Sequence, residues 1–221
     1  MADPEVDRIL EAYERRREDD RYGAGQPDQI SLLAARNRAW ALELRRFGHR
    51  PGRVLEVGSG GAGNLRWLLE LGAQQAIGID LIPERVAIGR SLSCSVDSLV
   101  ADGRHIPLRS GSVDTVVLST LVSSIIDDDV VRDLCTDVRR VLASGGAVLW
   151  FDFAVGNPSN RDVRRVARGK VKELFPGWQA SLHRVVLAPP VARRLTAHPS
   201  IAAALEAVPL LRTHLAGVIH A

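Results

Sequence analysis

Several features that mark particular protein classes are scarce in these 221 residues. Only two cysteines occur, and Cys94 and Cys135 have neither C-x-x-C spacing nor a histidine at ligand spacing, so the sequence predicts no disulfide framework and no metal site. No apolar run approaches the roughly 18 residues that a membrane helix needs. The first residues are acidic, whereas a secretory leader is basic and then apolar. We therefore expect a cytoplasmic protein without a membrane partner.

Aromatic residues are also rare, at 5% of the chain. The formal net charge is +3. Positive charge is concentrated in residues 161–194, with nine bases and two acids, whereas residues 1–20 carry four bases and eight acids. Surfaces that bind single-stranded nucleic acids combine bases with stacking aromatic side chains. Few aromatics interleave with this basic stretch, so we interpret it as solvated surface. Nucleic acid is not an expected partner, but an RNA substrate remains an open alternative.

The sequence does contain the alternation typical of an α/β fold. From residue 53 onward, short β-branched runs alternate with helical stretches, which predicts βαβ units and a parallel sheet. The predicted strands are 54–57, 76–80, 98–101, 113–119, 147–153, 179–187 and 213–220. The predicted helices are 5–20, 30–47, 65–71, 84–91, 129–142 and 161–175, with a helical region at 190–208 broken by Pro199.

The first 50 residues have a different texture. Apolar positions at helical spacing predict two helices there, and the sequence GHRPG at 48–52 separates them from the rest of the chain. We expect residues 1–50 to be a helical lid and residues 51–221 to be the main domain. Between the two predicted helices, YGAGQP at 22–27 breaks any helix.

A glycine-rich turn lies between the first predicted strand and its helix. Residues 54–64 read VLEVGSGGAGN, and Asp80 lies 22 residues after Gly58, as in a nucleotide-binding fingerprint. Glycine lets the backbone approach a ligand closely. Glu56 repels a pyrophosphate but suits a ligand with a cationic amino acid part. Asp80 and Asp102 follow strands two and three, where carboxylates can accept hydrogen bonds from ribose hydroxyls and from an exocyclic amine.

In these motifs the chain resembles the class I S-adenosylmethionine-dependent methyltransferases, in particular the small-molecule, type 11-like branch. The resemblance covers about residues 53–153 and includes VLEVGSG, GIDLIPE, ADGRHIPL before SVDTVVLS, and RVLASGGA. It implies a Rossmann-like sheet of seven strands with the last strand antiparallel, and S-adenosyl-L-methionine as cofactor, with S-adenosyl-L-homocysteine as product. The family's third alternating glycine falls on Ala62, so the turn can differ slightly there.

The resemblance also implies roles for individual residues. Glu56, Gly58 and Gly60 would line the methionine side and Asp80 would bind ribose. Asp102, Gly103 and Arg104 would frame the adenine. The other cofactor contacts that we expect are Ser59, Leu81 and Ser119.

Chemistry is expected beyond the carboxyl ends of strands four and five. Asp152 ends an apolar run and is our candidate base, with a structural acid bonded to nearby amides as an equal alternative. The candidate acceptor-binding residues are Tyr22, Ser123, Asn157 and Asn160. Asn160 is interpreted more readily as the cap of a helix from Arg161, and Asp127 to Asp129 as a helix start rather than a metal site.

In its last third the chain also resembles bacterial methyltransferases that are often associated with polysaccharide or secondary-metabolite pathways, through FDF at 151–153, NPSN at 157–160, LFPGW at 174–178, LAPP at 187–190 and LRTH at 211–214. This second resemblance implies methyl transfer, at oxygen, to a polar small molecule or a glycan. Besides RNA methylation, two alternatives remain: an NAD-dependent oxidoreductase, and a catalytically silent subunit that binds a nucleoside. The oxidoreductase hypothesis lacks one common device, because both tyrosines precede the sheet and no Tyr-x-x-x-Lys relay exists. A homodimer is an open alternative to a monomer.

Overall fold

The structure is a computed structural model that describes residues 3–17, 27–156, 162–188, 191, 194–195 and 198–221. Its centre is one seven-stranded sheet with the order β3-β2-β1-β4-β5-β7-β6. β7 runs antiparallel to both of its neighbours, and the other pairings are parallel, so the predicted α/β class and the reversed last strand are confirmed. The strands are β1 (Arg53–Val57), β2 (Gln75–Asp80), β3 (Asp97–Val100), β4 (Val113–Ser119), β5 (Leu142–Phe153), β6 (Gln179–Leu187) and β7 (Arg212–His220).

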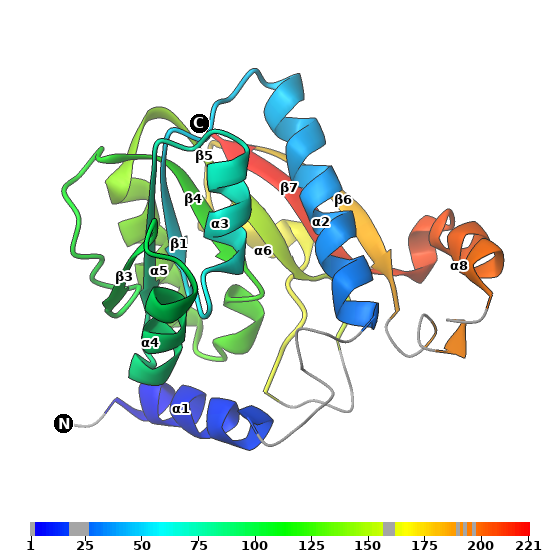
Figure 1. The fold of residues 1–221 in the computed structure, drawn as a ribbon, viewed down its shortest axis with the longest axis horizontal. Helices are drawn as coiled ribbons and strands as arrows, with labels where there is room; N and C mark the ends of the chain where they lie inside the picture. The colour runs from blue at the N-terminus through cyan, green and yellow to red at the C-terminus, as the bar shows by residue number, and fades with distance from the viewer. Residues whose placement is uncertain (1–2, 18–26, 157–161, 189–190, 192–193, 196–197) are drawn as a thin grey trace.

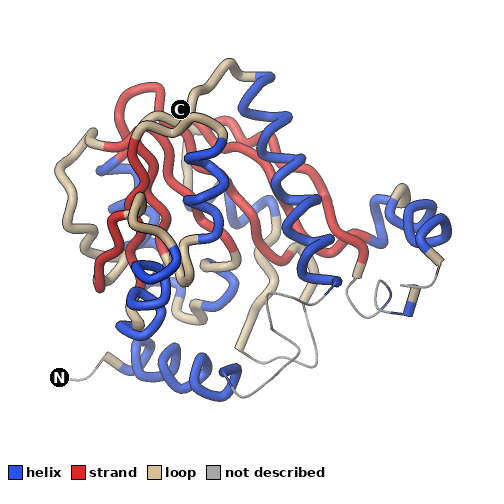
Figure 2. The backbone as a smooth tube through the Cα atoms, viewed as in Figure 1, coloured by secondary structure: helices blue, strands red, loops and turns tan. Residues whose placement is uncertain are grey.

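Helices cover both faces of this sheet (Figures 1 and 2). One face packs against α2, α3 and α4, and the other against α5 and α6. The helices are α1 (Pro4–Arg17), α2 (Pro27–Arg46), α3 (Gly63–Glu70), α4 (Pro83–Leu92), α5 (Asp128–Val141), α6 (Arg168–Leu174) and α8 (Pro199–Glu206), and two short 3-10 turns are η2 (Val122–Ser124) and η3 (Pro209–Leu211).

Alternation along the strands divides the core into two apolar layers. Trp150 of β5 points to the α5 side and packs edge-on against Phe175, whereas its neighbour Phe151 points to the α2 side. Trp40 of α2 is fully buried on that second side and its indole Nε1 donates a hydrogen bond to the Trp150 carbonyl at 2.9 Å. α2 is therefore part of the layer that covers β6 and β7.

The predicted helix at 161–175 was too long at its N-terminal end, because α6 begins only at Arg168. Residues 163–167 have no regular secondary structure. The backbone N–H of Arg164 donates to the Ser123 carbonyl and that of Val166 to the Phe153 carbonyl, both at 2.8 Å. These contacts tie the segment to the η2 turn and to the end of β5, and they use amide groups that a helix would need.

Within the predicted helical region at 190–208, the described residues Val191 and Arg194 are helical, whereas Leu195 and His198 are not. α8 begins at Pro199 and ends at Glu206, followed by the η3 turn. Proline suits the first turn of a helix because its missing N–H would have no intrahelical partner there. Pro199 therefore starts the second helical part, in agreement with the predicted break at this residue.

The carboxyl ends of the parallel strands open toward α1, which lies across that edge of the sheet (Figure 1). The two N-terminal helices therefore occupy different places. α1 faces the strand ends, whereas α2 packs along β6 and β7.

Candidate functional site

The glycine-rich turn after β1 has the backbone shape that its glycines allow. Gly58 and Gly60 have φ angles of 72° and 50°, in the left-handed region that L side chains rarely adopt. The N–H groups of Gly58 and Ser59 both donate to the Ile79 carbonyl, at 2.8 and 3.0 Å. Ala62 precedes α3 with φ 57°, so it keeps a left-handed conformation although it is not glycine.

Asp80 ends β2 beside this turn and is nearly buried. Its Oδ2 accepts the N–H of Gly60 at 2.9 Å, and its Oδ1 accepts the N–H of Ile82 at 3.0 Å. Arg85 of α4 approaches Oδ2 to 3.4 Å and places its guanidinium 4.7 Å from the centre of the Tyr13 ring. Asp80 thereby joins the glycine turn, α4 and α1.

Asp102 follows β3 and is held by Arg104. Arg104 donates to both carboxylate oxygens of Asp102, and its Nη1 also contacts the Asp3 carboxylate at 2.5 Å. Burial works against ionisation of Asp102, but the bonds from Arg104 keep the pKa of that carboxyl below its usual value. The second expected ligand carboxylate therefore lies in an ionic cluster that includes the start of the chain.

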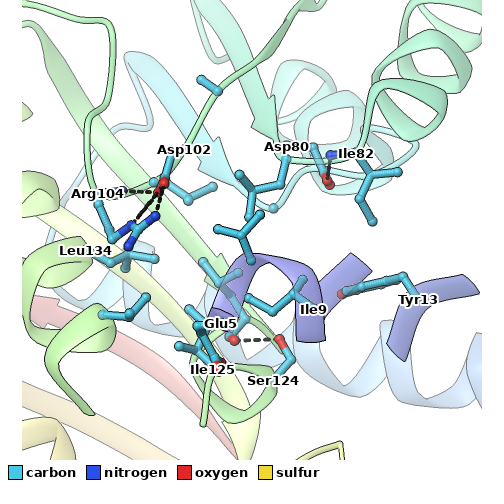
Figure 3. A pocket seen from close by; sticks show the side chains of 18 residues that line it. Glu5, Ile9, Tyr13, Asp80, Ile82, Asp102, Arg104, Ser124, Ile125 and Leu134 are labelled. Atoms are coloured by element: carbon cyan, nitrogen blue, oxygen red, sulfur yellow. Dashed lines mark hydrogen bonds and ion pairs between the residues drawn. The ribbon is translucent and has the colours of Figure 1, made fainter. Parts of the chain in front are cut away.

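These groups meet around one cavity of about 60 Å³ (Figure 3). Asp80 and Asp102 lie on one side of it, and Ile9 and Tyr13 of α1 lie on the other. The predicted cofactor residues that line this pocket are Gly58, Asp80, Leu81, Asp102, Gly103 and Arg104.

α1 is bound to the loop after β4 by polar contacts. Glu5 is nearly buried and its Oε1 accepts the N–H of Ile126 at 2.7 Å. Arg8 bonds to both oxygens of Glu5 and donates to the Ser124 carbonyl at 2.5 Å. These contacts and the Asp3–Arg104 pair hold α1 against the pocket.

Glu56 and Ser119 do not line this pocket and belong to a buried polar cluster on the α2 side of the sheet. Glu56 Oε1 accepts a hydrogen bond from Asn64 at 2.5 Å, and Oε2 has no hydrogen-bond partner. Arg36 of α2 is buried, lies 4.6 Å from the Trp40 ring centre, and its Nη1 is 3.4 Å from the Ser119 hydroxyl.

Burial shifts both charged members of this cluster toward their neutral forms. It raises the pKa of Glu56 to about 8 and lowers the pKa of Arg36 to about 10. Each charge partly opposes the other's shift. The cluster therefore places a buried carboxyl group and a buried guanidinium near the glycine turn, and a zwitterionic amino acid group would favour the charged form of both.

Asp152, the candidate base, is fully buried and does not line the pocket. It lies on the α5 side of the sheet, opposite the cluster that contains Glu56. Its Oδ2 accepts the N–H of Ser123 at 3.0 Å and its Oδ1 the N–H of Phe153 at 2.8 Å. Burial raises the pKa of Asp152 to about 6. These are the contacts of the structural alternative, in which the acid holds the η2 turn against β5.

The remaining predicted residues lie in several different places. Ser59 and Gly60 belong to the turn beside the pocket, and Ser123 is buried in η2. Asp127 caps α5 through hydrogen bonds from the N–H groups of Asp129 and Val130, as predicted. Three of the four acceptor-binding candidates lie outside the described residues: Tyr22, Asn157 and Asn160.

Sequence reasoning missed Arg36, Arg85 and the α1 residues of the pocket. Apolar spacing predicted α1 as a helix, but periodicity does not show where a helix docks. Nothing in the sequence around Arg36 distinguished it from the other arginines. Only the docking of α2 brings it to Ser119.

The described stretches of the chain contain neither a metal-binding cluster nor a membrane-spanning helix. No group of three or more His, Cys, Asp or Glu residues there is arranged to hold a metal ion. Nor is any helix in those stretches long and apolar enough to cross a membrane.

The sequence of residues 54–146 matches a protein family described as "Methyltransferase domain". No curated protein matches the chain significantly. Among solved structures, an S-adenosylmethionine-dependent methyltransferase from Mesorhizobium loti is 19% identical with a TM-score of 0.59, covering 80% of this chain and 95% of its own. A protein from Pyrococcus horikoshii is 15% identical with a TM-score of 0.67, covering 94% and 98%.

A third similar structure is the [4+2]-cyclase SpnF, at 18% identity and a TM-score of 0.60, covering 92% of this chain and 85% of its own. At such low identities these likenesses establish the fold. The match to a methyltransferase domain covers residues 54–146, which is less than half of the chain.

Proposed function

We propose, from the similarity of residues 54–146 to a methyltransferase domain, that this protein is an S-adenosylmethionine-dependent enzyme that methylates a hydroxyl oxygen of a polar small molecule or glycan. The observation that carries the proposal is the meeting of Gly58, Asp80 and Asp102 at one pocket beyond the strand ends. Ligands of open α/β sheets bind at that edge. The expected product besides the methylated acceptor is S-adenosyl-L-homocysteine.

The residues present fit such a cofactor in their chemistry. When bound, S-adenosylmethionine supplies a methyl group on a sulfonium sulfur. Asp80 offers carboxylate oxygens for ribose hydroxyls, and Asp102 with Gly103 and Arg104 would frame the adenine. The unpartnered Oε2 of Glu56 suits an α-ammonium group. Arg36, which sequence reasoning did not single out, suits an α-carboxylate.

The chain's own contribution to the chemistry would be alignment and exclusion of water. An in-line displacement gains most from holding nucleophile and methyl group in register. Asp152 remains the candidate for holding the acceptor's proton, supported by its position at the end of β5 and a pKa raised to about 6. Ser119, Ser123, Tyr22, Asn157 and Asn160 are proposed to surround the cofactor's reactive end or the acceptor.

We propose that α1, within the helical segment formed by the first 50 residues, acts as the lid of this site. A cavity of about 60 Å³ is far below the roughly 300–1,000 Å³ typical of small-molecule pockets. Ile9 and Tyr13 occupy its α1 side. Cofactor entry therefore requires α1 to move outward, and its return would exclude water from the bound ligand.

The first test is calorimetric titration of the full chain with S-adenosylmethionine, S-adenosylhomocysteine and NAD. Binding of both sulfur compounds but not NAD is expected. Asp80→Asn should remove most of this affinity, whereas Asp97→Asn, an exposed acid at the start of β3, serves as the matched control. Binding of NAD alone would contradict the proposal, and undiminished affinity in Asp80→Asn would remove that residue from the ribose role.

Truncated ligands test the role proposed for Arg36. Arg36→Lys keeps the charge but loses the planar group that lies over Trp40. Affinity for S-adenosylhomocysteine should fall about tenfold, equivalent to 1.4 kcal/mol, while affinity for adenosine stays unchanged. Equal losses for the two ligands would instead indicate general disruption of the site.

A second candidate function is adenosyl binding without methyl transfer. The observation that favours it is the occupation of the pocket, because Asp102 is bonded by Arg104 and α1 leaves little space. Turnover with a panel of hydroxylated acceptors distinguishes the two functions. Asp152→Asn should lower turnover without changing cofactor affinity, and unchanged turnover would exclude Asp152 as the base.

A further inference from the structure

A second depression lies on the α2 face of the sheet, away from the glycine turn. It measures about 520 Å³ and lies between α2, β6 and the residues from the end of α8 to the start of β7. Figure 1 shows α2 alongside β6, with α8 beyond that edge of the sheet. The volume is within the range of small-molecule sites. We call this depression the arginine groove, after the lining residues Arg38, Arg184 and Arg212.

Positive charge dominates the lining of the arginine groove. Glu206 is the one acid among its described lining residues. None of the ion pairs between described residues includes Arg38, Arg184 or Arg212. The nearby buried acid Glu43 is instead met by His183 at 2.8 Å. The groove therefore holds more cationic than anionic groups.

Two of the three arginines are fixed in place by the backbone. Arg184 Nη1 donates to the Arg212 carbonyl at 3.2 Å, and Arg212 Nη1 donates to the Arg184 carbonyl at 2.9 Å. Arg212 Nε also donates to the Glu206 carbonyl. Among contacts between described residues, these bonds use one N–H of Arg184 and two N–H groups of Arg212, of the five that each guanidinium carries. Two like charges are thus held close together, which an anion between them would stabilise.

The other part of the lining is apolar. Ala35, Ala39 and Leu42 come from one face of α2, with Val185 and Ala207 opposite. A fully hydrated inorganic ion would gain nothing from this surface, whereas a ligand with an apolar body would bury it. The strand beneath is unusual as well, since Val186 has φ 66°, a conformation rare for β-branched residues.

We propose that the arginine groove is a binding site for a small amphiphilic anion, with a carboxylate or phosphate group at the arginines and an apolar body along α2. Oxyanions of both kinds match the planar, forked donors of arginine. The inference does not depend on methyl transfer, because none of its residues belongs to the cofactor pocket.

The test is calorimetric titration of the full chain with 1-naphthoate, 1-naphthyl phosphate, neutral 1-naphthol and inorganic phosphate. At least one naphthyl anion should bind about tenfold more tightly than both 1-naphthol and inorganic phosphate. The tighter of the two naphthyl anions identifies the oxyanion as carboxylate or phosphate. If 1-naphthol binds as well as both anions, or neither anion binds, the proposal is wrong.

Variants locate that binding. Arg38→Gln changes an exposed side chain and should lower the affinity for the tighter-binding anion about fivefold. Arg184→Gln alone should lower this affinity by more than Arg38→Gln does. Arg109→Gln, an exposed arginine outside both pockets, is the matched control and should bind like the parent chain. Binding unchanged in both groove variants overturns the proposal. The titrations are repeated with excess S-adenosylhomocysteine, so that failure of the cofactor site and failure of the groove are separately visible.

Discussion

Individual buried charges explain much of the chemistry near the glycine turn. Glu56 and Arg36 are removed from water, and burial pushes the pKa of each toward its neutral form. Isolated buried charges are costly, and their mutual attraction offsets that cost only in part. A zwitterionic ligand group would provide a partner for both. In the ligand-free protein this cluster therefore lowers the stability of the fold, and a bound ligand would remove that cost.

Glu56→Gln tests that interpretation through pH. The pKa of Glu56 is raised to about 8 in the folded chain from an ordinary value of 4.5, so its folded form binds more protons across that interval. Stability from this group is present at low pH and is lost as pH rises toward 8. The variant should therefore gain free energy of unfolding relative to the parent chain as pH rises from 5 to 8, on the order of a few kcal/mol.

Urea unfolding at a series of pH values measures this difference. Glu70→Gln, an exposed acid on α3, is the control and should follow the parent chain. Parallel curves for Glu56→Gln and the parent chain between pH 5 and 8 would show that the carboxyl of Glu56 has no raised pKa.

At the residue scale the sequence predicted what depends on local pattern. Asp80 and Asp102 follow strands, and the carboxyl ends of parallel strands share one edge, so their convergence at the pocket was predictable. Ala62 was expected to alter the turn, yet it has φ 57° and retains the left-handed shape. Arg36 was not predictable, because its position depends on how α2 packs rather than on its neighbours in sequence.

Among the elements, α1 depends most on ionic contacts. Asp3 pairs with Arg104, and Arg8 and Glu5 bind the loop after β4. Pairs near the surface are weakened by salt. A helix held by such contacts can open without unfolding the sheet, which suits the lid role that we propose.

Asp3→Asn should therefore speed cofactor entry. Loss of the Asp3–Arg104 pair favours the open position of α1, so the association rate of S-adenosylhomocysteine should rise about twofold to fivefold at low ionic strength, as expected for loss of one partly solvent-exposed ion pair. Stopped-flow tryptophan fluorescence measures this rate. Glu14→Gln, an exposed acid on the same helix, is the control. Equal association rates in the parent chain and both variants would show that the Asp3–Arg104 pair does not hold α1 closed.

α5 offers a direct test of a sequence-based interpretation. Asp127 accepts N–H bonds from Asp129 at 2.7 Å and Val130 at 3.3 Å. Asp127→Ala should lower the free energy of unfolding by about 1 kcal/mol, the usual value of such a cap. Asp133→Ala, an exposed acid within the helix, should stay within about 0.5 kcal/mol. Equal effects of the two changes in urea unfolding would contradict a capping role.

Element boundaries show where local reasoning stops. The strands from β1 to β7 were predicted within a few residues of their ends, except that β5 begins five residues earlier, at Leu142. The predicted helix at 161–175 failed in its first half because the backbone of Arg164 bonds to the η2 turn and that of Val166 bonds to the end of β5. Such tertiary contacts override helical propensity, and no local pattern reveals them.

On the scale of the whole molecule, one sheet supports both of the binding sites that we propose. The cofactor pocket lies at the carboxyl ends of the strands, and the arginine groove lies on the face covered by α2. α2 contributes to both regions through neighbouring residues, since Arg36 reaches Ser119 while Ala35 and Arg38 line the groove. The resemblance of the motifs implied the strand arrangement, but neither the groove nor the route of α2 followed from it.

Binding at the strand edge should stabilise the whole chain, because both apolar layers pack on the same sheet. With S-adenosylhomocysteine at 100 times its Kd, the folded state gains about 2.7 kcal/mol. For a chain of this size that corresponds to a rise in Tm of about 5–10 °C. Differential scanning calorimetry should show one transition that moves as a unit, while NAD at the same concentration leaves Tm unchanged. Two transitions, of which only one shifts, would mean that the ligand stabilises α1 and the strand edge without coupling to the α2 layer.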